Sequence, residues 1–233
     1  MEIRLPFKDK TDVNDSEKVQ YNSVKGRVRI YEHKIKNSDK KLYLLRDTTN
    51  LVVFRGRNWL AQRAFNTNMS STTIDMKSLY PCWLAIGTGA TIAGNPTAVS
   101  SPDLTNTELS AHGVIDSGIR YVTVDGKQYH LFDNGYPTII EDTEVSAVGL
   151  TTLNDRKLIA KTITTFEANE ANNDGGISDS SSYQEISEAG VFVSDSDDIY
   201  PVPTIMRLFA RVTFPTVVKN NSVRLIIEWE FYF

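Results

Sequence analysis

The chain has 233 residues, of which 40% are hydrophobic and 23% are charged. This balance is ordinary for a globular protein with a packed core, and it excludes wholesale disorder. No apolar run approaches the roughly 20 residues that span a bilayer. The charged N-terminus lacks the apolar region of a secretory signal, so we expect neither membrane insertion nor export.

Charge is unevenly distributed along the chain. Residues 1–57 contain 14 Lys and Arg against 8 Asp and Glu, whereas residues 58–233 contain 11 against 21. Nucleic-acid-binding proteins present a strong basic patch, and most of this chain is acidic, so we do not expect nucleic-acid binding. The lone cysteine, Cys82, excludes an internal disulfide and zinc motifs of paired thiolates, and it suits a reducing compartment.

The first segment is predicted to be an arm. Residues 1–23 are polar and offer little to bury beyond Ile3, Leu5 and Phe7. Such a segment is expected to order only against a partner.

The arm is followed by a predicted hairpin. From Val24 to Tyr31, apolar residues alternate with polar or basic ones, a turn follows at Asn37–Asp39, and Lys41–Leu45 returns as a second strand. The outer face of this hairpin is expected to be basic.

One helix is predicted over residues 57–67. It follows the apolar run Leu51–Phe54, and its pattern places Trp59, Leu60 and Ala64 along one side. Trp59 and Phe65 are expected to be core residues.

A buried strand and a long connection come next. Trp83–Ile86 is short and apolar and ends in Gly87-Thr88-Gly89. Residues 90–113 are dense in Ser, Thr, Asn and Pro, so they are predicted to be a long surface loop with little regular structure. A loop of that length usually contacts something.

The second half of the chain is predicted to be entirely β. Asp125-Gly126 supplies the positive φ of a tight hairpin turn, and Val223–Phe233 has six alternate apolar residues, typical of a core strand. Further strands are predicted at 119–124, 128–132, 158–166, 183–193 and 206–214. The fold class is therefore mainly β: an antiparallel sandwich or small barrel with one short helix and long polar loops.

Short motifs along residues 24–233 resemble, in order and spacing, a diffuse family of tailed-bacteriophage virion proteins of tails, baseplates, fibres and necks. The motifs are the basic hairpin, Asn50-Leu51-Val52-Val53, Gly56-Arg57, Ile86-Gly87-Thr88-Gly89, Glu188-Ala189-Gly190-Val191-Phe192, Leu208-Phe209-Ala210-Arg211-Val212-Thr213-Phe214, and a closing strand around Trp229 and Phe231. The resemblance implies a β-rich assembly subunit without catalysis. The domain organisation is then an arm at 1–23 and one β-rich domain at 24–233, comprising hairpin and strand (24–56), helix (57–67) and sandwich (83–233).

Catalytic motifs do not emerge from the sequence. His33, His112 and His130 are far apart, and none has metal-ligand spacing. Gly87-Thr88-Gly89 lacks the lysine and hydroxyl of a phosphate loop, so a turn at a strand end is the better interpretation. We expect no enzyme, no cofactor and no small-molecule substrate.

Acidic segments have similar ordinary interpretations. Asn172–Asp179 has calcium-type oxygen ligands around a glycine turn but lacks the later bidentate Glu, so a hairpin tip is preferred. The run Asp195–Asp198 is predicted to be a solvated loop. The pairs Glu185/Glu188 and Glu228/Glu230 are predicted to lie on solvent-facing sides of strands rather than to form an acid–base pair.

The functional hypothesis is a virion structural protein, made in the host cytoplasm, that forms a homo-oligomeric ring or an adaptor of the neck, tail or baseplate. A capsid decoration or head-fibre protein is one alternative. A receptor- or carbohydrate-binding module is another, with Tyr80, Trp83, Tyr129 and Tyr136 as candidate contacts. Opposite charges on neighbouring copies are predicted to dock. The candidate interface residues are Lys25, Arg27, Arg29, Lys34, Lys36, Asp174, Asp179, Asp195, Asp197 and Asp198.

Overall fold

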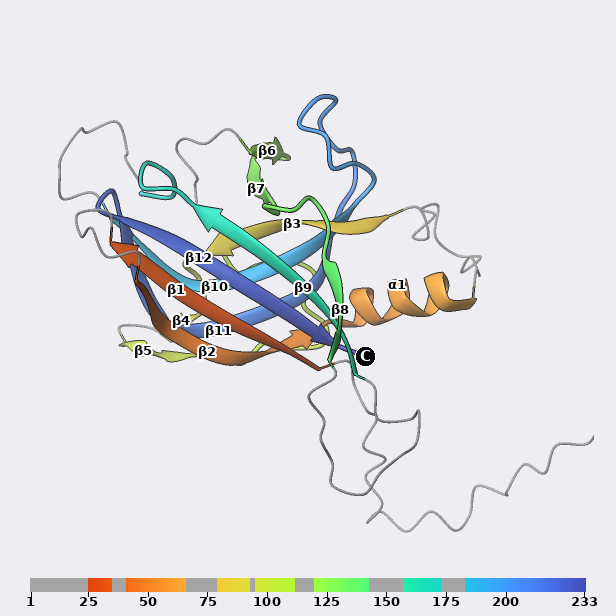
Figure 1. The fold of residues 1–233 in the computed structure, drawn as a ribbon, viewed down its shortest axis with the longest axis horizontal. Coiled ribbons are helices and arrows are strands. Elements are labelled where there is room, and N and C mark those ends of the chain that lie inside the picture. The colour runs from red at the N-terminus through yellow and green to blue at the C-terminus, as the bar shows by residue number, and fades with distance from the viewer. Residues whose placement is uncertain are drawn as a thin grey trace, which may run out of the picture.

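The computed structural model describes residues 25–34, 41–65, 79–92, 95–111, 120–142, 157–172 and 183–233. Within these residues the chain is mainly β with one helix (Figure 1). The elements in chain order are β1 (Lys25–Lys34), β2 (Leu42–Val52), α1 (Phe54–Phe65), β3 (Tyr80–Gly87), β4 (Thr91–Ile92), β5 (Asn95–Val99), β6 (Tyr121–Val124), β7 (Lys127–Leu131), β8 (Thr138–Asp142), β9 (Lys157–Phe166), β10 (Tyr183–Ser194), β11 (Met206–Asn220) and β12 (Val223–Tyr232).

Ten of the described strands form one antiparallel sheet in the order β6-β7-β3-β10-β11-β2-β1-β12-β9-β8. The sheet curls strongly (Figure 1). As a result, strands that are far apart in this order come into contact. The ring of His130 in β7 lies 4.9 Å from that of Phe166 in β9, and the Asp133 amide after β7 donates to the Ile163 carbonyl oxygen at 2.9 Å. The prediction of an antiparallel, mainly β fold with one helix is confirmed, in the form of a half-barrel with a small second sheet, β4–β5.

The main hydrophobic core fills the inside of the curl. Alternate residues of β12 supply it, with Ile227, Trp229 and Phe231 buried, and Phe231 packs edge-on against Phe209 of β11 at 5.1 Å. The prediction that the last strand is a core strand is confirmed. Phe233 is the exception, because β12 ends at Tyr232 and the Phe233 side chain is exposed.

A second apolar cluster lies on the opposite face of β3, β10 and β11. Trp83 and Phe192 project from that face, and Tyr129 of the β6–β7 hairpin and Leu109 of the loop after β5 cover them. These three strands are therefore buried on both faces, which explains why β11 is apolar on both sides around Leu208.

The β6–β7 hairpin has the predicted turn. Asp125 and Gly126 both have positive φ, 51° and 74°. Such a pair matches the twist of the flanking strands.

Helix α1 begins three residues earlier than predicted, at Phe54, and residues 66 and 67 lie outside the described residues. Trp59 fixes the helix to the sheet: its ring packs edge-on against Phe209 at 5.4 Å, and its Nε1 donates to the Leu79 carbonyl oxygen at 2.9 Å. The prediction of Trp59 as core is confirmed. Ala64 is exposed, and the side chain of Phe65 lies outside the described part of the chain.

Other predicted boundaries also change. The strand expected at Lys41–Leu45 continues to Val52, because β1 pairs with it as far as Leu51 and β11 pairs with Val52. Within the stretch expected to be irregular, the β4–β5 hairpin forms. Strand β8 was not predicted, and the arm lies outside the described residues.

Candidate functional site

Three motifs that carry the family resemblance meet at one place on the sheet. Gly87, the last residue of β3, lies opposite Glu188 of β10. On the other side of β10, Arg211 of β11 lies opposite Gly190. Loop residues 106–111 complete a polar group that we call the loop-anchoring cluster: Gly87, Gly89, Asn106, Ser110, Ala111, Glu188 and Arg211.

Glu188 is the centre of this cluster. Its Oε1 accepts hydrogen bonds from the amides of Gly89 at 3.2 Å and Ala111 at 2.9 Å. Its Oε2 accepts from the Ser110 amide at 3.1 Å. The carboxylate therefore bridges the turn after β3 and the end of the long loop.

Arg211 completes the coordination of the carboxylate. Its Nε and Nη2 both donate to Glu188 Oε2, at 3.0 and 2.6 Å. Its Nη1 donates to Asn106 Oδ1 and its Nη2 to Ser110 Oγ, both at 2.7 Å. The side chains of Glu188 and Arg211 are 0% and 5% exposed, so this is a fully enclosed ion pair. Charge-assisted bonds of this kind are stronger than neutral ones.

The glycines are required by close approach of the loop. A Cβ at Gly87 would lie 2.2 Å from the Ala111 carbonyl oxygen, and a Cβ at Gly89 would lie 2.6 Å from the Ala111 amide nitrogen. The Thr88 amide donates to that same carbonyl oxygen at 3.0 Å. The prediction that Gly87-Thr88-Gly89 is a turn at a strand end is confirmed.

The predicted position of Glu188 on a solvent-facing side is wrong. Glu188 lies on the side of β10 that carries Phe192 and faces away from the main core, but the loop at Ser110 and Ala111 covers it there, so Glu188 is buried while Glu185 is exposed. Every contact of the carboxylate described above is to the protein's own donors. The cluster is built to hold a loop, with its charges satisfied internally.

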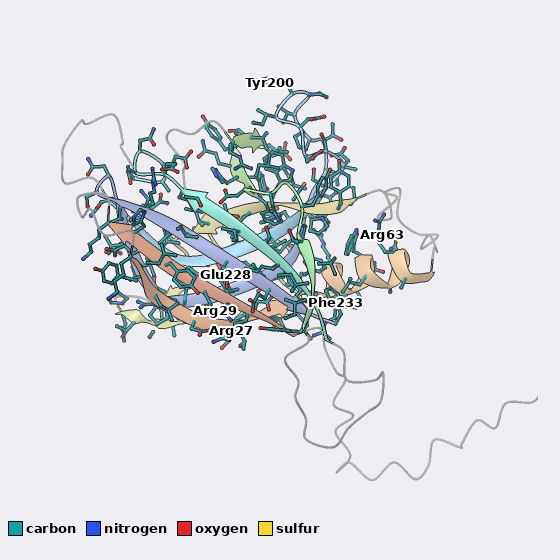
Figure 2. The ribbon with its side chains drawn as sticks, in the orientation of Figure 1. Arg27, Arg29, Arg63, Tyr200, Glu228 and Phe233 are labelled. Atoms are coloured by element: carbon teal, nitrogen blue, oxygen red, sulfur yellow. The ribbon has the colours of Figure 1, made fainter. Side chains whose placement is uncertain are left out.

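The predicted basic face of the hairpin is also wrong in part, because β2 and β12 supply carboxylates to it (Figure 2). Arg27 of β1 donates to Asp47 of β2, with Nε to Oδ1 at 2.7 Å. The hydrogen bond from Arg27 is the main cause that lowers the pKa of Asp47. Arg29 contacts Glu228 and lies 3.0 Å from Glu230.

Two further groups extend this set of ion pairs on the outer strand face. Lys161 of β9 lies 2.6 Å from Glu228, and the Tyr232 hydroxyl donates to Glu230 at 2.6 Å. Burial alone would raise the pKa of Glu228, but hydrogen bonds from Lys161 and Arg29 outweigh it, and the pKa lies below its usual value. Glu228 and Glu230 share one side of β12, as predicted, but the prediction that this side faces solvent is wrong for Glu230, which is buried among its partners. We call this set the strand-face network: Arg27, Arg29, Asp47, Lys161, Glu228, Glu230 and Tyr232.

The remaining predicted interface residues are not brought together by the described structure. Lys34 lies 3.6 Å from Glu32 and 5.5 Å from the Tyr43 ring centre. For Lys25 the structure gives a position in β1, opposite Tyr232. Lys36, Asp174 and Asp179 lie outside the described residues.

The acidic loop after β10 is ordered by its own side chains. Asp195 accepts from the Thr204 and Ile205 amides, each at 3.1 Å. The amide of Asp198 donates to Ser196 Oγ at 2.9 Å. Asp195 therefore folds the loop back on itself.

The candidate calcium segment begins inside the described structure, and its first residue contacts a lysine. Lys219 is fully buried, and its Nζ donates to Asn172 Oδ1 at 3.0 Å, to the Ala168 carbonyl oxygen at 3.2 Å and to the Asn220 carbonyl oxygen at 2.9 Å. An ammonium thus supplies the positive charge among these oxygens. Residues 173–179 lie outside the described residues.

Two of the four candidate glycan contacts come together. The rings of Tyr80 and Tyr136 lie 5.2 Å apart, and the Tyr80 hydroxyl donates to Asp197 Oδ1 at 3.4 Å. Trp83 and Tyr129 are buried in the second apolar cluster.

Comparisons of the chain with protein-family profiles, curated protein sequences and solved structures give no significant match. Within the described residues, no group of three His, Cys, Asp or Glu side chains is placed to hold a metal ion. No helix in that part of the chain has the length and apolarity needed to cross a bilayer.

The histidines and the cysteine are placed separately. His130 is buried against Phe166, and burial lowers its pKa to about 4. Cys82 is buried in β3, and burial raises the pKa of its thiol. His33 lies in β1 opposite Arg224, and His112 lies outside the described residues.

Sequence reasoning missed the pairing of Glu188 with Arg211. The signal was present: Arg211 stands between the apolar residues Ala210 and Val212, and Glu188 directly precedes the apolar run Ala189–Val193 of its strand. A charge in that setting is rarely buried unless it is paired. Two such charges of opposite sign predict a buried ion pair, although not which loop it holds.

Proposed function

We propose that the chain is a structural subunit of a tailed-bacteriophage virion, where it holds other virion proteins together in a ring or as an adaptor of the neck, tail or baseplate. Its partners are other copies of itself and neighbouring virion proteins. A capsid decoration or head-fibre position differs from this proposal in location alone.

The observation that carries the proposal is the role of the resemblance motifs. Their chemistry-bearing residues, Glu188 and Arg211, form an enclosed pair that anchors residues 106–111 against the sheet. A motif set that fixes a surface loop serves a scaffold. Loops positioned by a rigid scaffold are where proteins place their binding contacts.

Exposed apolar side chains on this scaffold give partners something to bind. Phe54, which opens α1, is 68% exposed, and its amide donates to the carbonyl oxygen of Leu104, which precedes the anchored residues 106–111 and has an exposed side chain. Leu104 and the start of α1 thus present apolar groups side by side. Apolar groups gathered on a surface favour protein contacts.

Mass spectrometry of gradient-purified phage particles tests this proposal. Peptides of the chain should co-sediment with infectious particles in constant proportion to the major capsid protein. A chain that is abundant in the lysate and absent from the particles would exclude a virion role.

A receptor- or glycan-binding module is a second candidate, and one observation favours it. Tyr136 is partly exposed beside Tyr80 and Asp197, and the adjoining loop carries Tyr200, which is 86% exposed (Figure 2). Aromatic faces beside a carboxylate suit a sugar ring with its hydroxyls. Binding on a glycan array that Tyr136→Ala abolishes would support this function, whereas a silent array would exclude it for the sugars present.

A further inference from the structure

Strand β8 leaves one margin of the curled sheet unpaired within the described structure. It pairs with β9, and it ends the strand order on that side (Figure 1). An edge strand presents backbone donors and acceptors that can pair with another strand, and natural proteins usually blunt such an edge.

The side chains of β8 are apolar on both faces of this margin. Ile139 lies opposite Ala160, which belongs to the main core, yet Ile139 is 64% exposed. Ile140 lies opposite Ile159 on the outer face and is 41% exposed. The core is therefore open at this margin, and a further strand would cover it.

The outer face beside β8 is hollowed. A depression of about 460 Å³ is lined by Ile140, Ile163, Thr138 and Lys161 together with Asp133 and Asn134. Its floor combines isoleucines with a lysine. This lining suits a strand with both apolar and polar side chains.

A segment of the chain itself has the matching pattern. In the arm, Ile3, Leu5 and Phe7 alternate with Arg4 and Pro6. Successive side chains of a strand point to opposite faces, so the three apolar residues would extend the core past Ile139.

The charges of the arm and the position of its proline also fit a strand placed beside β8. The arm carries Arg4 and Lys8, and β8 ends in Glu141 and Asp142. Pro6 has no amide hydrogen, so it is tolerated where its backbone points away from the sheet. In that orientation Leu5 and Phe7 direct their backbone groups toward β8, and the proline stops further strand addition.

The arm is long enough to extend well past the β8 edge of its own copy. Lys25, where β1 begins, lies opposite Tyr232, which lies opposite Ile159. Ile159 lies opposite Ile140, so three strand spacings, about 14 Å, separate the arm's origin from β8. Residues 8–24 span up to about 56 Å when extended.

We propose that residues 3–7 of one copy add as a strand to β8 of a neighbouring copy. This proposal rests on the assembly function, because it names the contact by which copies are joined. Such strand addition takes affinity from the backbone and specificity from alternate side chains. Each copy gives an arm and receives one, so the contact is heterologous and suits a ring.

Cysteine crosslinking between two versions of the full chain tests the proposal. A size-tagged chain with Lys8→Cys is mixed with an untagged chain carrying Thr138→Cys and treated with a short bis-maleimide. The matched control places the same substitution, Thr123→Cys, on β6 at the opposite margin of the sheet, where Thr123 is also exposed. Wild type contains Cys82, which is buried, and supplies the background.

A tagged–untagged dimer should form with Thr138→Cys and be absent with Thr123→Cys. Adding Ile139→Lys and Ile140→Lys to the Thr138→Cys chain should remove the dimer, because charge replaces the apolar edge. The proposal would be overturned if the dimer formed equally with Thr138→Cys and Thr123→Cys, or if no crosslink formed. A single chain that carries both Lys8→Cys and Thr138→Cys gives the third check. A crosslink found only within that chain, and not between chains, would also overturn the proposal. None of these results would remove the chain from virions, so the proposed function is tested separately.

Discussion

The loop-anchoring cluster and the strand-face network use the same chemistry in different surroundings. Glu188 and Arg211 are enclosed between the sheet and the loop, whereas Arg27 and Asp47 lie on an outer strand face with side chains 43% and 33% exposed. Water screens the second pair but not the first. The difference teaches that ion pairs of similar geometry contribute very differently to this fold, and that the enclosed pair is the one that organises a loop.

The largest effect is expected from shortening β12. Deleting Glu230–Phe233 removes two members of the strand-face network, Glu230 and Tyr232, together with the buried ring of Phe231. Burying such a ring stabilises by roughly 1.5–3 kcal/mol, and the loss of strand pairing with Lys25–Arg27 adds to it. The truncated chain should be insoluble or should not melt cooperatively. Glu230→Gln, which keeps the ring, should remain soluble; a soluble, cooperative truncation would show that the last strand is dispensable.

Arg211→Met tests the enclosed pair. It leaves the Glu188 carboxylate buried without its guanidinium, which typically costs about 3–5 kcal/mol out of a total stability of roughly 5–15 kcal/mol. Urea denaturation should show that loss, and proteases should cut residues 106–111 first. A variant as stable as wild type, with the loop still protected, would mean that the cluster does not anchor it.

Acid sensitivity should trace to His130. Burial lowers its pKa in the folded state to about 4, against about 6.5 in an unfolded chain. Between these values the unfolded chain binds the proton more readily, so stability falls as the pH drops through that range, by about 3 kcal/mol in all. His130→Leu should flatten the curve of unfolding free energy between pH 6.5 and 4. A curve of unchanged slope would assign the acid sensitivity to other groups.

The smallest effect is expected from Arg27→Met, the same change as Arg211→Met made in the strand-face network. An exposed pair is worth roughly 0–1 kcal/mol, so denaturation should barely shift. Because the pair is screened, 1 M salt should reduce even that difference. A loss as large as that of Arg211→Met would remove the distinction between the two regions.

Local signals in the sequence predicted the elements that depend on neighbours in the chain. The Asp125-Gly126 turn and the alternation in β12 are of this kind, and both are confirmed. The sheet order was not predictable, because β2 lies between β1 and β11 through contacts that no local pattern encodes. Strand β8 was missed because Ile139 and Ile140 are adjacent rather than alternating with polar residues.

The candidate site also combines features that local sequence signals predict with features that depend on residues remote in the chain. The glycines around Thr88 predicted a turn, since two glycines permit an unusual backbone. The partner of that turn, Ala111, is held there by Glu188 of β10, which is remote in sequence. Glu188 is buried because that remote loop covers the outer face of β10, so its burial could not be foreseen from alternation.

Imaging the particle by cryo-EM tests the central claim most directly. The account predicts repeated copies of the curled ten-stranded sheet in the neck, tail or baseplate, with the exposed surface at Phe54 and Leu104 in contact with a neighbouring protein. A map in which every virion component is traced and none has this sheet would contradict it.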